Sequence, residues 1–183
     1  LQVLSNAGEL KIPMTTGVLV GIGETPHEII DSLFAIKELH DKFGHIQEII
    51  LQNFQPKHDT WMKNAPSAEE NYFKTMVAIS RIIMPKMNIQ IPPNLSPYSY
   101  QYFLDAGIND WGGISPLTQD YVNPEFGWPQ IEFVEKHTKT AGFALKARFP
   151  VYPDMFGMVN DDLLDRMRPI MDKAGHVSEE YWR

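Results

Sequence analysis

The stretch that decides the fold lies near the start of the chain and reads Thr15-Thr16-Gly17-Val18-Leu19-Val20-Gly21-Ile22-Gly23-Glu24-Thr25-Pro26-His27-Glu28. Its first six residues form a largely apolar run that predicts a buried strand, and the glycines that follow predict a tight turn. Thr25, Pro26 and Glu28 then predict the start of a helix, because a Thr cap and a Glu three residues later satisfy backbone N–H groups that a helix leaves free. A strand is therefore followed directly by a helix.

The same order recurs along the chain. Apolar runs at residues 46–53, 88–91 and 108–111 predict three further strands, and residues 143–149 are a candidate for a fifth. Gly44 is expected to end the first long helix, and Ser67-Ala68-Glu69-Glu70 predicts a capping box at the start of the next. Buried strands that alternate with helices are typical of parallel sheets. We therefore expect an α/β fold with about four to five parallel strands alternating with helices.

The composition excludes several classes of protein. The chain has 183 residues, with 16 Lys and Arg against 23 Asp and Glu, and its net charge is −7. An acidic chain without a basic stripe does not suit nucleic acid or an anionic membrane as a partner. No stretch approaches the roughly 20 apolar residues that span a bilayer. There is no cysteine, so no thiolate can act as a nucleophile or a metal ligand.

Polar side chains follow the expected strands, where parallel α/β folds bind their ligands. Asn53, Gln55, Asn94 and Asn109 carry amides, which can donate to and accept from an uncharged polar ligand, although loop capping explains many such residues equally well. Asp110 can orient a substrate or accept a proton, or it can cap the next loop. These positions are the candidate binding residues.

Two other features carry weaker signals. The glycines at 17–23 allow a ligand to approach the backbone, but a tight strand-to-helix turn explains them as well. They match neither a P-loop nor the G-x-G-x-x-G pattern of dinucleotide-binding proteins. His58 and Asp59 are adjacent, but no second His stands at a metal-binding spacing. We therefore expect no metal site in this chain.

One string resembles the G-x-I-x-G-x-x-E element of radical S-adenosylmethionine enzymes. Its matching residues are Gly17, Leu19, Gly21 and Glu24. Further strings closely resemble the FO synthases, in particular the subunit or half that closes the deazaflavin ring. The resemblance runs from about residue 12 to residue 152. The strings are Gly44-His45-Ile46-Gln47-Glu48-Ile49-Ile50-Leu51-Gln52-Asn53-Phe54, Asn88-Ile89-Gln90-Ile91-Pro92-Pro93-Asn94-Leu95 and Ala106-Gly107-Ile108-Asn109-Asp110-Trp111-Gly112-Gly113-Ile114-Ser115-Pro116.

The resemblance implies a fold. Residues 1–150 would form the second, C-terminal half of a (β/α) TIM-type barrel like that of biotin synthase, and residues 151–183 would form a tail with a short helix. The strands described above would be the fifth to the eighth of that barrel.

The resemblance also implies a reaction. In this family a [4Fe-4S] cluster reduces S-adenosylmethionine to methionine and a deoxyadenosyl radical. The radical abstracts hydrogen from an adduct of a tyrosine-derived hydroxybenzyl group and a ribityl-diaminouracil, and ring closure with loss of ammonia yields the deazaflavin. The tyrosine-using half or subunit of the synthase would be a partner, and this oxygen-sensitive chemistry implies the cytoplasm.

Roles for individual residues follow from the same resemblance. S-adenosylmethionine would lie against the glycine element, and Asp110 is the candidate catalytic group. The expected cofactor-binding residues are Gly17, Leu19, Gly21, Gly23 and Glu24, and the expected substrate-binding residues are Gln52, Asn53, Gln55, Pro92, Asn94 and Asn109.

The chain departs from the family at one point, because the C-x-x-x-C-x-x-C motif that holds the cluster is absent. We therefore expect the C-terminal half of a barrel that is inactive alone and requires the N-terminal half. One alternative is a non-catalytic half-barrel that completes a cysteine-bearing chain. Another is a related radical enzyme of menaquinone synthesis by the futalosine route, and a third is a metal-dependent hydrolase that uses His58 and Asp59.

Overall fold

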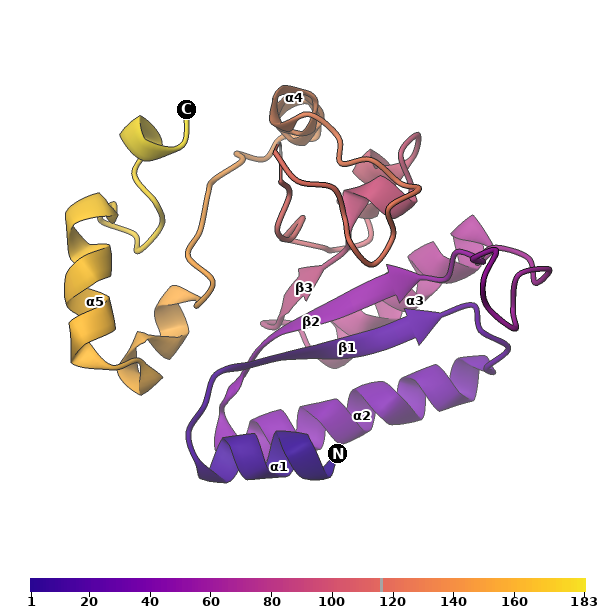
Figure 1. The fold of residues 1–183 in the computed structure, drawn as a ribbon. Coiled ribbons are helices and arrows are strands. Elements are labelled where there is room, and N and C mark those ends of the chain that lie inside the picture. The colour runs from indigo at the N-terminus through magenta and orange to yellow at the C-terminus, as the bar shows by residue number, and fades with distance from the viewer. Residues whose placement is uncertain (116) are drawn as a thin grey trace.

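The computed structural model describes residues 1–115 and 117–183, so Pro116, at the end of the third family string, lies outside the described residues. Helices and strands alternate through the first half of the chain (Figure 1). They are α1 (Gln2–Glu9), β1 (Met14–Val20), α2 (Pro26–Phe43), β2 (Ile46–Asn53), α3 (Glu70–Ile83), β3 (Asn88–Gln90), α4 (Ile131–Thr140) and α5 (Asp161–Met167). Short 3-10 helices lie at Pro93–Leu95, Tyr100–Phe103, Pro153–Met158, Arg168–Ile170 and Glu179–Tyr181.

The strands form a parallel sheet in the order β1-β2-β3, which confirms the α/β class. The number of strands differs from the expected four to five, because the described residues form three. The expected strand at 108–111 makes a single parallel bridge, between Asp110 and Gln90. It ends there because Gly112 has a φ of +77°, which turns the chain away from the sheet.

The candidate fifth strand at residues 143–149 does not pair with the sheet. The carbonyl of Ala147 instead accepts a hydrogen bond of 3.0 Å from the N–H of Val177 in the C-terminal tail. The side chain of Arg148 points to the sheet and forms ion pairs with it. This segment therefore joins the fold through side chains, which the apolar pattern of its sequence did not indicate.

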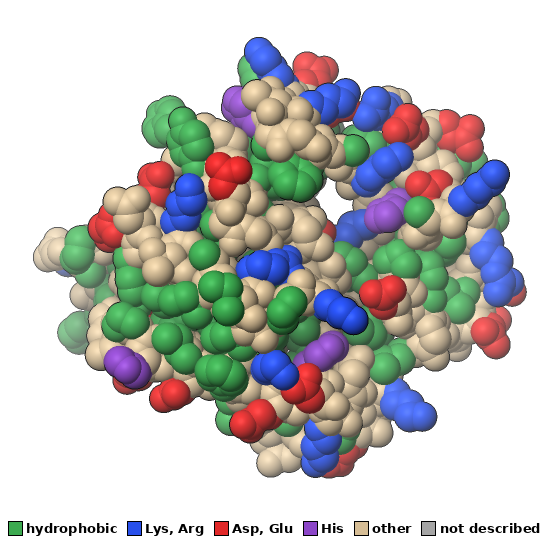
Figure 2. All heavy atoms as spheres, turned by 180° about the vertical axis from the view of Figure 1, so that it is seen from behind, with side chains coloured by type: hydrophobic (Ala, Val, Ile, Leu, Met, Phe, Trp, Pro, Cys, Tyr) green, Lys and Arg blue, Asp and Glu red, His purple; other side chains and the backbone are tan. Residues whose placement is uncertain are grey.

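The two long helices α2 and α3 pack together on one face of the sheet (Figure 1). The buried side chains between these layers include Ile29, Leu33 and Ile36 of α2, Phe73, Met76 and Val77 of α3, and Val20, Ile49, Leu51 and Ile89 of the strands. Viewed from behind, the molecule shows hydrophobic side chains gathered between charged ones (Figure 2). No helix among the described residues has the length and apolar character needed to cross a membrane.

The opposite face of the sheet, which we call the open face, is more polar. Strand register identifies its residues, because directly paired positions in a parallel sheet point to the same side. Thr15 pairs with Glu48, Leu19 pairs with Gln52, and Ile50 pairs with Gln90. The bridge from Gln90 to Asp110 extends this face beyond β3. Polar side chains in the middle of a sheet distinguish this face from the packed one.

The local signals at the start of α2 are confirmed. Thr25 is the N-cap, its hydroxyl accepts from the N–H of Glu28, and the Glu28 carboxylate accepts from the N–H of Thr25 at 2.7 Å. Gly44 ends α2 with a φ of +68°. The capping box expected at the start of α3 is wrong, because the N-cap is Glu69 and Ser67 instead donates to Gln55.

The tail expected at 151–183 contains a short helix, α5, which lies to one side of the sheet in Figure 1. Its Asn160 cap accepts from the N–H of Asp162 at 2.8 Å. A 3-10 turn containing Pro169 follows directly, because proline lacks the N–H that a continuing α-helix needs.

Candidate functional site at the open face of the sheet

The glycine element is shaped partly by packing. A β-carbon on Gly17 would stand 1.9 Å from the carbonyl oxygen of Ile50, so the two strands could not approach as they do with any other residue there. Gly21 has a φ of +100°, and a β-carbon on it would lie 2.5 Å from the side chain of Ala68. Gly23 also has a positive φ, +106°, but the space beside it is open. Packing therefore accounts for two of these glycines, and Gly23 leaves backbone accessible.

Glu24 closes the turn after β1. Its two carboxylate oxygens accept hydrogen bonds of 2.8 Å from the N–H groups of Gly21 and Ile22, and the Tyr72 hydroxyl donates at 3.2 Å. Partial burial would raise the pKa of Glu24, but these hydrogen bonds outweigh it and hold the pKa below its usual value. Glu24 therefore remains ionised and keeps the turn in shape.

The surface beside this turn is apolar and open. Leu19 and Ile22 are 38% and 44% exposed, and they flank a backbone that is open at Gly23. Exposed apolar side chains next to accessible backbone suit a flat heteroaromatic ring such as adenine. An iron–sulfur cluster does not fit this chain, because it has no cysteine. No group of three or more His, Asp or Glu residues within 1–115 and 117–183 could hold a metal ion.

Three of the predicted substrate-binding amides lie at or just after the ends of β2 and β3. Asn53 and Gln55 both donate to the carbonyl of Leu95, at 3.0 and 2.9 Å. The Asn94 amide nitrogen donates to Asp120 at 2.9 Å and to the carbonyl of Phe126 at 3.1 Å, while its oxygen is buried without a partner among the described residues. The structure therefore brings Asn53 and Gln55 together at one carbonyl, directs Asn94 to a different loop, and uses most of the hydrogen-bonding groups of all three amides to hold loops.

Gln52 and Pro92, the other predicted substrate residues at the strand ends, are half-buried. Gln52 pairs with Leu19, so both belong to the open face. Leu19 is one of the exposed side chains beside the glycine turn. Gln52 therefore lies on the open face beside Leu19, next to the glycine turn.

Asn109 lies beside Asp110 but is used differently. Its oxygen accepts from the N–H of Ile89 at 2.8 Å, and its nitrogen donates to the side chain of Asn88 at 2.8 Å. Arg81 also donates to this oxygen, at 3.3 Å. The Asn109 amide thus supplies the hydrogen-bond partner that a neighbouring strand would give the N–H of Ile89 in β3. A role of Asn109 in substrate binding stays a prediction.

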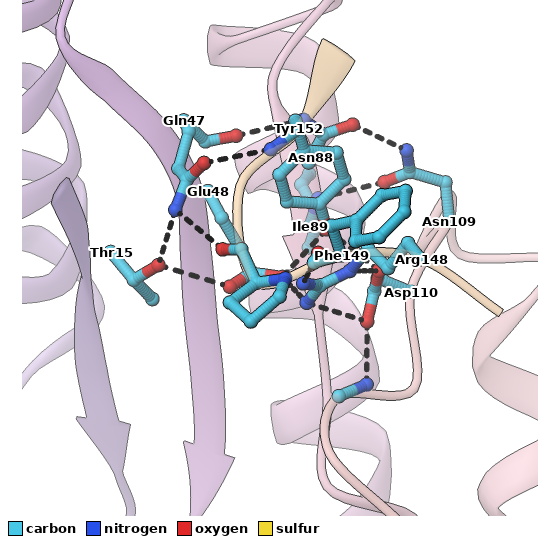
Figure 3. A network of polar contacts seen from close by, with 12 residues as sticks. Thr15, Gln47, Glu48, Asn88, Ile89, Asn109, Asp110, Arg148, Phe149 and Tyr152 are labelled. Carbon is cyan, nitrogen blue, oxygen red and sulfur yellow. Dashed lines mark hydrogen bonds and ion pairs between the residues drawn. The ribbon is translucent and has the colours of Figure 1, made fainter. Parts of the chain in front are cut away.

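Asp110 belongs to a polar cluster on the open face (Figure 3). Arg148 Nε and the N–H of Gly112 each donate to its carboxylate at 2.5 Å, and the Tyr152 hydroxyl contacts it at 2.7 Å. The side chain is 11% exposed. These contacts give Asp110 a structural role at the end of the sheet, and its catalytic role stays a prediction.

Glu48 faces Asp110 across the same cluster. Its carboxyl contacts Arg148 Nη2 at 2.9 Å, the Tyr152 hydroxyl at 2.7 Å and the Thr15 hydroxyl at 3.2 Å. Burial raises the pKa of Glu48, and the charge of Asp110 adds to that effect, against the opposing influence of Tyr152 and Arg148. The guanidinium of Arg148 also lies over the Tyr152 ring, 4.4 Å from its centre.

Sequence reasoning missed Glu48, Arg148 and Tyr152 as members of this cluster. A signal for Glu48 was present, since a carboxylate in the middle of a buried strand needs a partner. Nothing local pointed to Arg148 and Tyr152, which stand 100 and 104 residues away along the chain. His58 and Asp59 are exposed loop residues.

Comparison with known proteins places this geometry in context. No family model matches the chain. It is 51% identical over 152 residues to the 7,8-didemethyl-8-hydroxy-5-deazariboflavin synthase of Methanocaldococcus jannaschii, which is 83% of this chain and 42% of that protein. Against the enzymes of the same name from Methanococcus vannielii and Methanopyrus kandleri, identity is 48% over 167 residues and 47% over 154 residues.

These matches cover 90% and 84% of this chain, and 46% of each of those two proteins. The chain thus spans less than half the length of the curated relatives that it matches. Over most of its length, this chain is a homologue of part of the 7,8-didemethyl-8-hydroxy-5-deazariboflavin synthases, known as FO synthases.

Proposed function

We propose that this chain forms part of a radical S-adenosylmethionine FO synthase, as the C-terminal half of the (β/α) barrel that closes the deazaflavin ring. The observation that carries the proposal is 51% identity over 152 residues to a protein named for this product. The structure supports it with a parallel sheet whose helices cover one face and whose other face is polar. In parallel α/β barrels the ligand site lies at the carboxyl ends of the strands, and Gln52 lies there, one residue before the end of β2.

The residues of the chain divide into two proposed roles. When bound, S-adenosylmethionine supplies the group that abstracts hydrogen from the substrate, and the turn at Gly21–Glu24 with Leu19 holds its adenosyl part. Gln52 recognises the polar edge of the ribityl-diaminouracil portion, since its half-buried amide can both donate and accept. Because the chain has no cysteine, thiolate ligands for a [4Fe-4S] cluster come from outside it. This oxygen-sensitive chemistry suits the cytoplasm.

Coexpression tests this function directly. The chain would be produced together with a polypeptide carrying the C-x-x-x-C-x-x-C motif and the first half of a relative's barrel. The complex would then receive the tyrosine-using half of the synthase, tyrosine, the diaminouracil and S-adenosylmethionine under anaerobic conditions. We expect a complex that forms the fluorescent deazaflavin, and no product when either barrel half is omitted.

The intact relative serves as the positive control for the assay. If the two polypeptides form a complex that yields no product while the intact relative is active, the chain is a non-catalytic barrel partner. If they do not associate at all, the proposed half-barrel is wrong.

A further inference from the structure

A single hydroxyl lies between two carboxyl groups on the open face. The Tyr152 oxygen is 2.7 Å from Oε1 of Glu48 and 2.7 Å from Oδ2 of Asp110 (Figure 3). A tyrosine hydroxyl carries one proton, so it can donate to only one of them. The other contact is a hydrogen bond only if that carboxyl group carries a proton and donates it to the tyrosine oxygen. The geometry therefore requires one more proton than two carboxylates and a tyrosine provide.

The contacts of the two carboxyl groups show where this proton belongs. Asp110 accepts from Arg148 Nε at 2.5 Å and from the backbone N–H of Gly112 at 2.5 Å, and both donors favour its charged form. Arg148 also donates to Glu48, but through Nη2 and at the longer distance of 2.9 Å. The Glu48 side chain is 4% exposed, against 11% for Asp110, so ionisation of Glu48 loses more hydration. The charge accordingly rests on Asp110 and the proton on Glu48.

We propose that Glu48 is a carboxylic acid in the folded protein, that hydrogen bonds run from Glu48 to Tyr152 and from Tyr152 to Asp110, and that this proton holds residues 147–152 on the sheet. We call this segment the strap. With Glu48 neutral, the carboxylate of Asp110 faces the guanidinium of Arg148 in a balanced pair. The proposal does not depend on the function proposed above.

The neighbours of Glu48 are compatible with its neutral form. The charged and titratable groups that face it are Asp110, Arg148 and Tyr152, and Thr15 of β1 donates from the other side at 3.2 Å. After half a turn of its amide, the Gln90 nitrogen can donate to Oε1 and Oε2 of Glu48 at 3.0 and 3.2 Å. These oxygens can accept it in the neutral as well as in the charged form, so Glu48 keeps its one proton for Tyr152.

The strap has a second attachment beside Glu48. The Gln47 side chain donates to the carbonyl of Pro150 at 3.1 Å and accepts from the N–H of Tyr152 at 3.0 Å. When Glu48 ionises, two carboxylates face one guanidinium, and Tyr152 can donate to only one of them. Because the pKa of Glu48 is raised on folding, the stabilisation of the strap is complete below the ordinary pKa and is lost as the pH rises through the raised value.

Infrared spectroscopy of the full chain tests where the proton is, without any substitution. At about pH 7, ordinary carboxyl groups are ionised, so a carbonyl band of a protonated carboxylic acid is diagnostic. We expect such a band. We also expect its frequency to shift when glutamate is labelled with carbon-13, and to stay unchanged when aspartate is labelled. Absence of the band, or a shift on aspartate labelling, overturns the proposal.

Hydrogen exchange at the Tyr152 amide tests the strap. In the unaltered chain its protection should fall by up to about tenfold for each pH unit between the ordinary pKa of a glutamate and the raised pKa of Glu48, and then level off. Glu48→Gln keeps that position neutral and should make the protection independent of pH, whereas Asp154→Asn, an exposed change next to the strap, should behave like the unaltered chain. Protection that shows no such fall in the unaltered chain, or the same fall in Glu48→Gln, overturns the coupling between the proton and the strap.

Discussion

Gly17 lies so close to Ile50 of the neighbouring strand that a β-carbon on Gly17 would stand 1.9 Å from the Ile50 carbonyl oxygen. The two residues are direct partners in the parallel register of β1 and β2. The first glycine of the family element is therefore required by strand packing before any ligand is considered. This distinction matters because a substitution at Gly17 would otherwise be interpreted as loss of a cofactor contact.

Gly17→Ala should therefore destabilise the fold. Overpacking of a tightly packed site costs about 1–3 kcal/mol, and here the neighbour is backbone that cannot rotate away. Urea unfolding of the full chain measures the loss. Gly127→Ala is the control, since nothing lies near that position and its φ is ordinary, and it should change stability little. Equal stability of the two variants would contradict the packing explanation.

Arg81 joins the end of α3 to the segment before Asp110. Its guanidinium donates to the carbonyls of Met87 and Gly107 at 2.6 and 2.7 Å, and also to those of Met84 and Pro85. Arg81→Met should lower the free energy of unfolding by about 2 kcal/mol, because hydrogen bonds from a charged group are lost and carbonyls are left unpaired. Arg166→Met, on the exposed side of α5, is the matched control and should have a small effect. If Arg81→Met lowers the free energy of unfolding no more than Arg166→Met does, water satisfies these carbonyls as well as the guanidinium does.

The lowered pKa of Glu24 predicts that the protein loses stability as the pH falls into the acid range. Since folding lowers the pKa of Glu24, its contribution is complete above the ordinary value near 4.5 and is lost as the pH falls through the lowered value. Glu24→Gln should therefore flatten the fall in stability below about pH 5, measured by urea unfolding at several pH values. Glu180→Gln, an exposed change in the tail, should keep the original slope. If the free energy of unfolding falls equally steeply with pH in both variants, Glu24 does not contribute to the acid dependence.

Gln52 and Asn109 should respond differently to truncation, although both were predicted to bind substrate. In the coexpressed complex, Gln52→Ala should lower kcat/KM for the diaminouracil adduct about tenfold, equivalent to about 1.4 kcal/mol, with little change in unfolding. Asn109→Ala should lower the free energy of unfolding by about 1–3 kcal/mol, because the N–H of Ile89 loses its acceptor. Steady-state kinetics and thermal unfolding of the same preparations separate the two effects. An unaltered kcat/KM for Gln52→Ala would exclude that residue from the substrate site.

Asp110→Ala separates a catalytic role from a structural one. Removing this carboxylate leaves the guanidinium of Arg148, which is 20% exposed, without its closest partner, and breaking such a pair typically costs about 3–5 kcal/mol. We expect a loss of stability together with reduced turnover and unchanged cluster content in the complex. Reduced turnover at full stability would instead identify Asp110 as a catalytic group, and unaltered turnover would remove it from the site.

Local features of this protein could be predicted because neighbouring residues decide them. The cap at Thr25 and the end of α2 at Gly44 follow from hydrogen bonds within a turn of chain, and the strand at Ile46–Asn53 follows from its apolar pattern. The start of α3 was predicted less well, because Glu69 competes with Ser67 for the capping position and Ser67 has a partner, Gln55, that lies 12 residues away.

The sequence by itself determined the α/β class, the start and end of α2, and which polar residues follow the strands, since all of these depend on local periodicity and backbone chemistry. Only the tertiary structure decided what those polar residues contact. Asp110 meets Arg148 and Tyr152 across 38 and 42 residues. Asn109, its direct neighbour, instead contacts Ile89 and Arg81. The physical reason is that successive side chains along an extended chain point to opposite sides, so the partner of each is set by whatever segment the whole fold brings to that side.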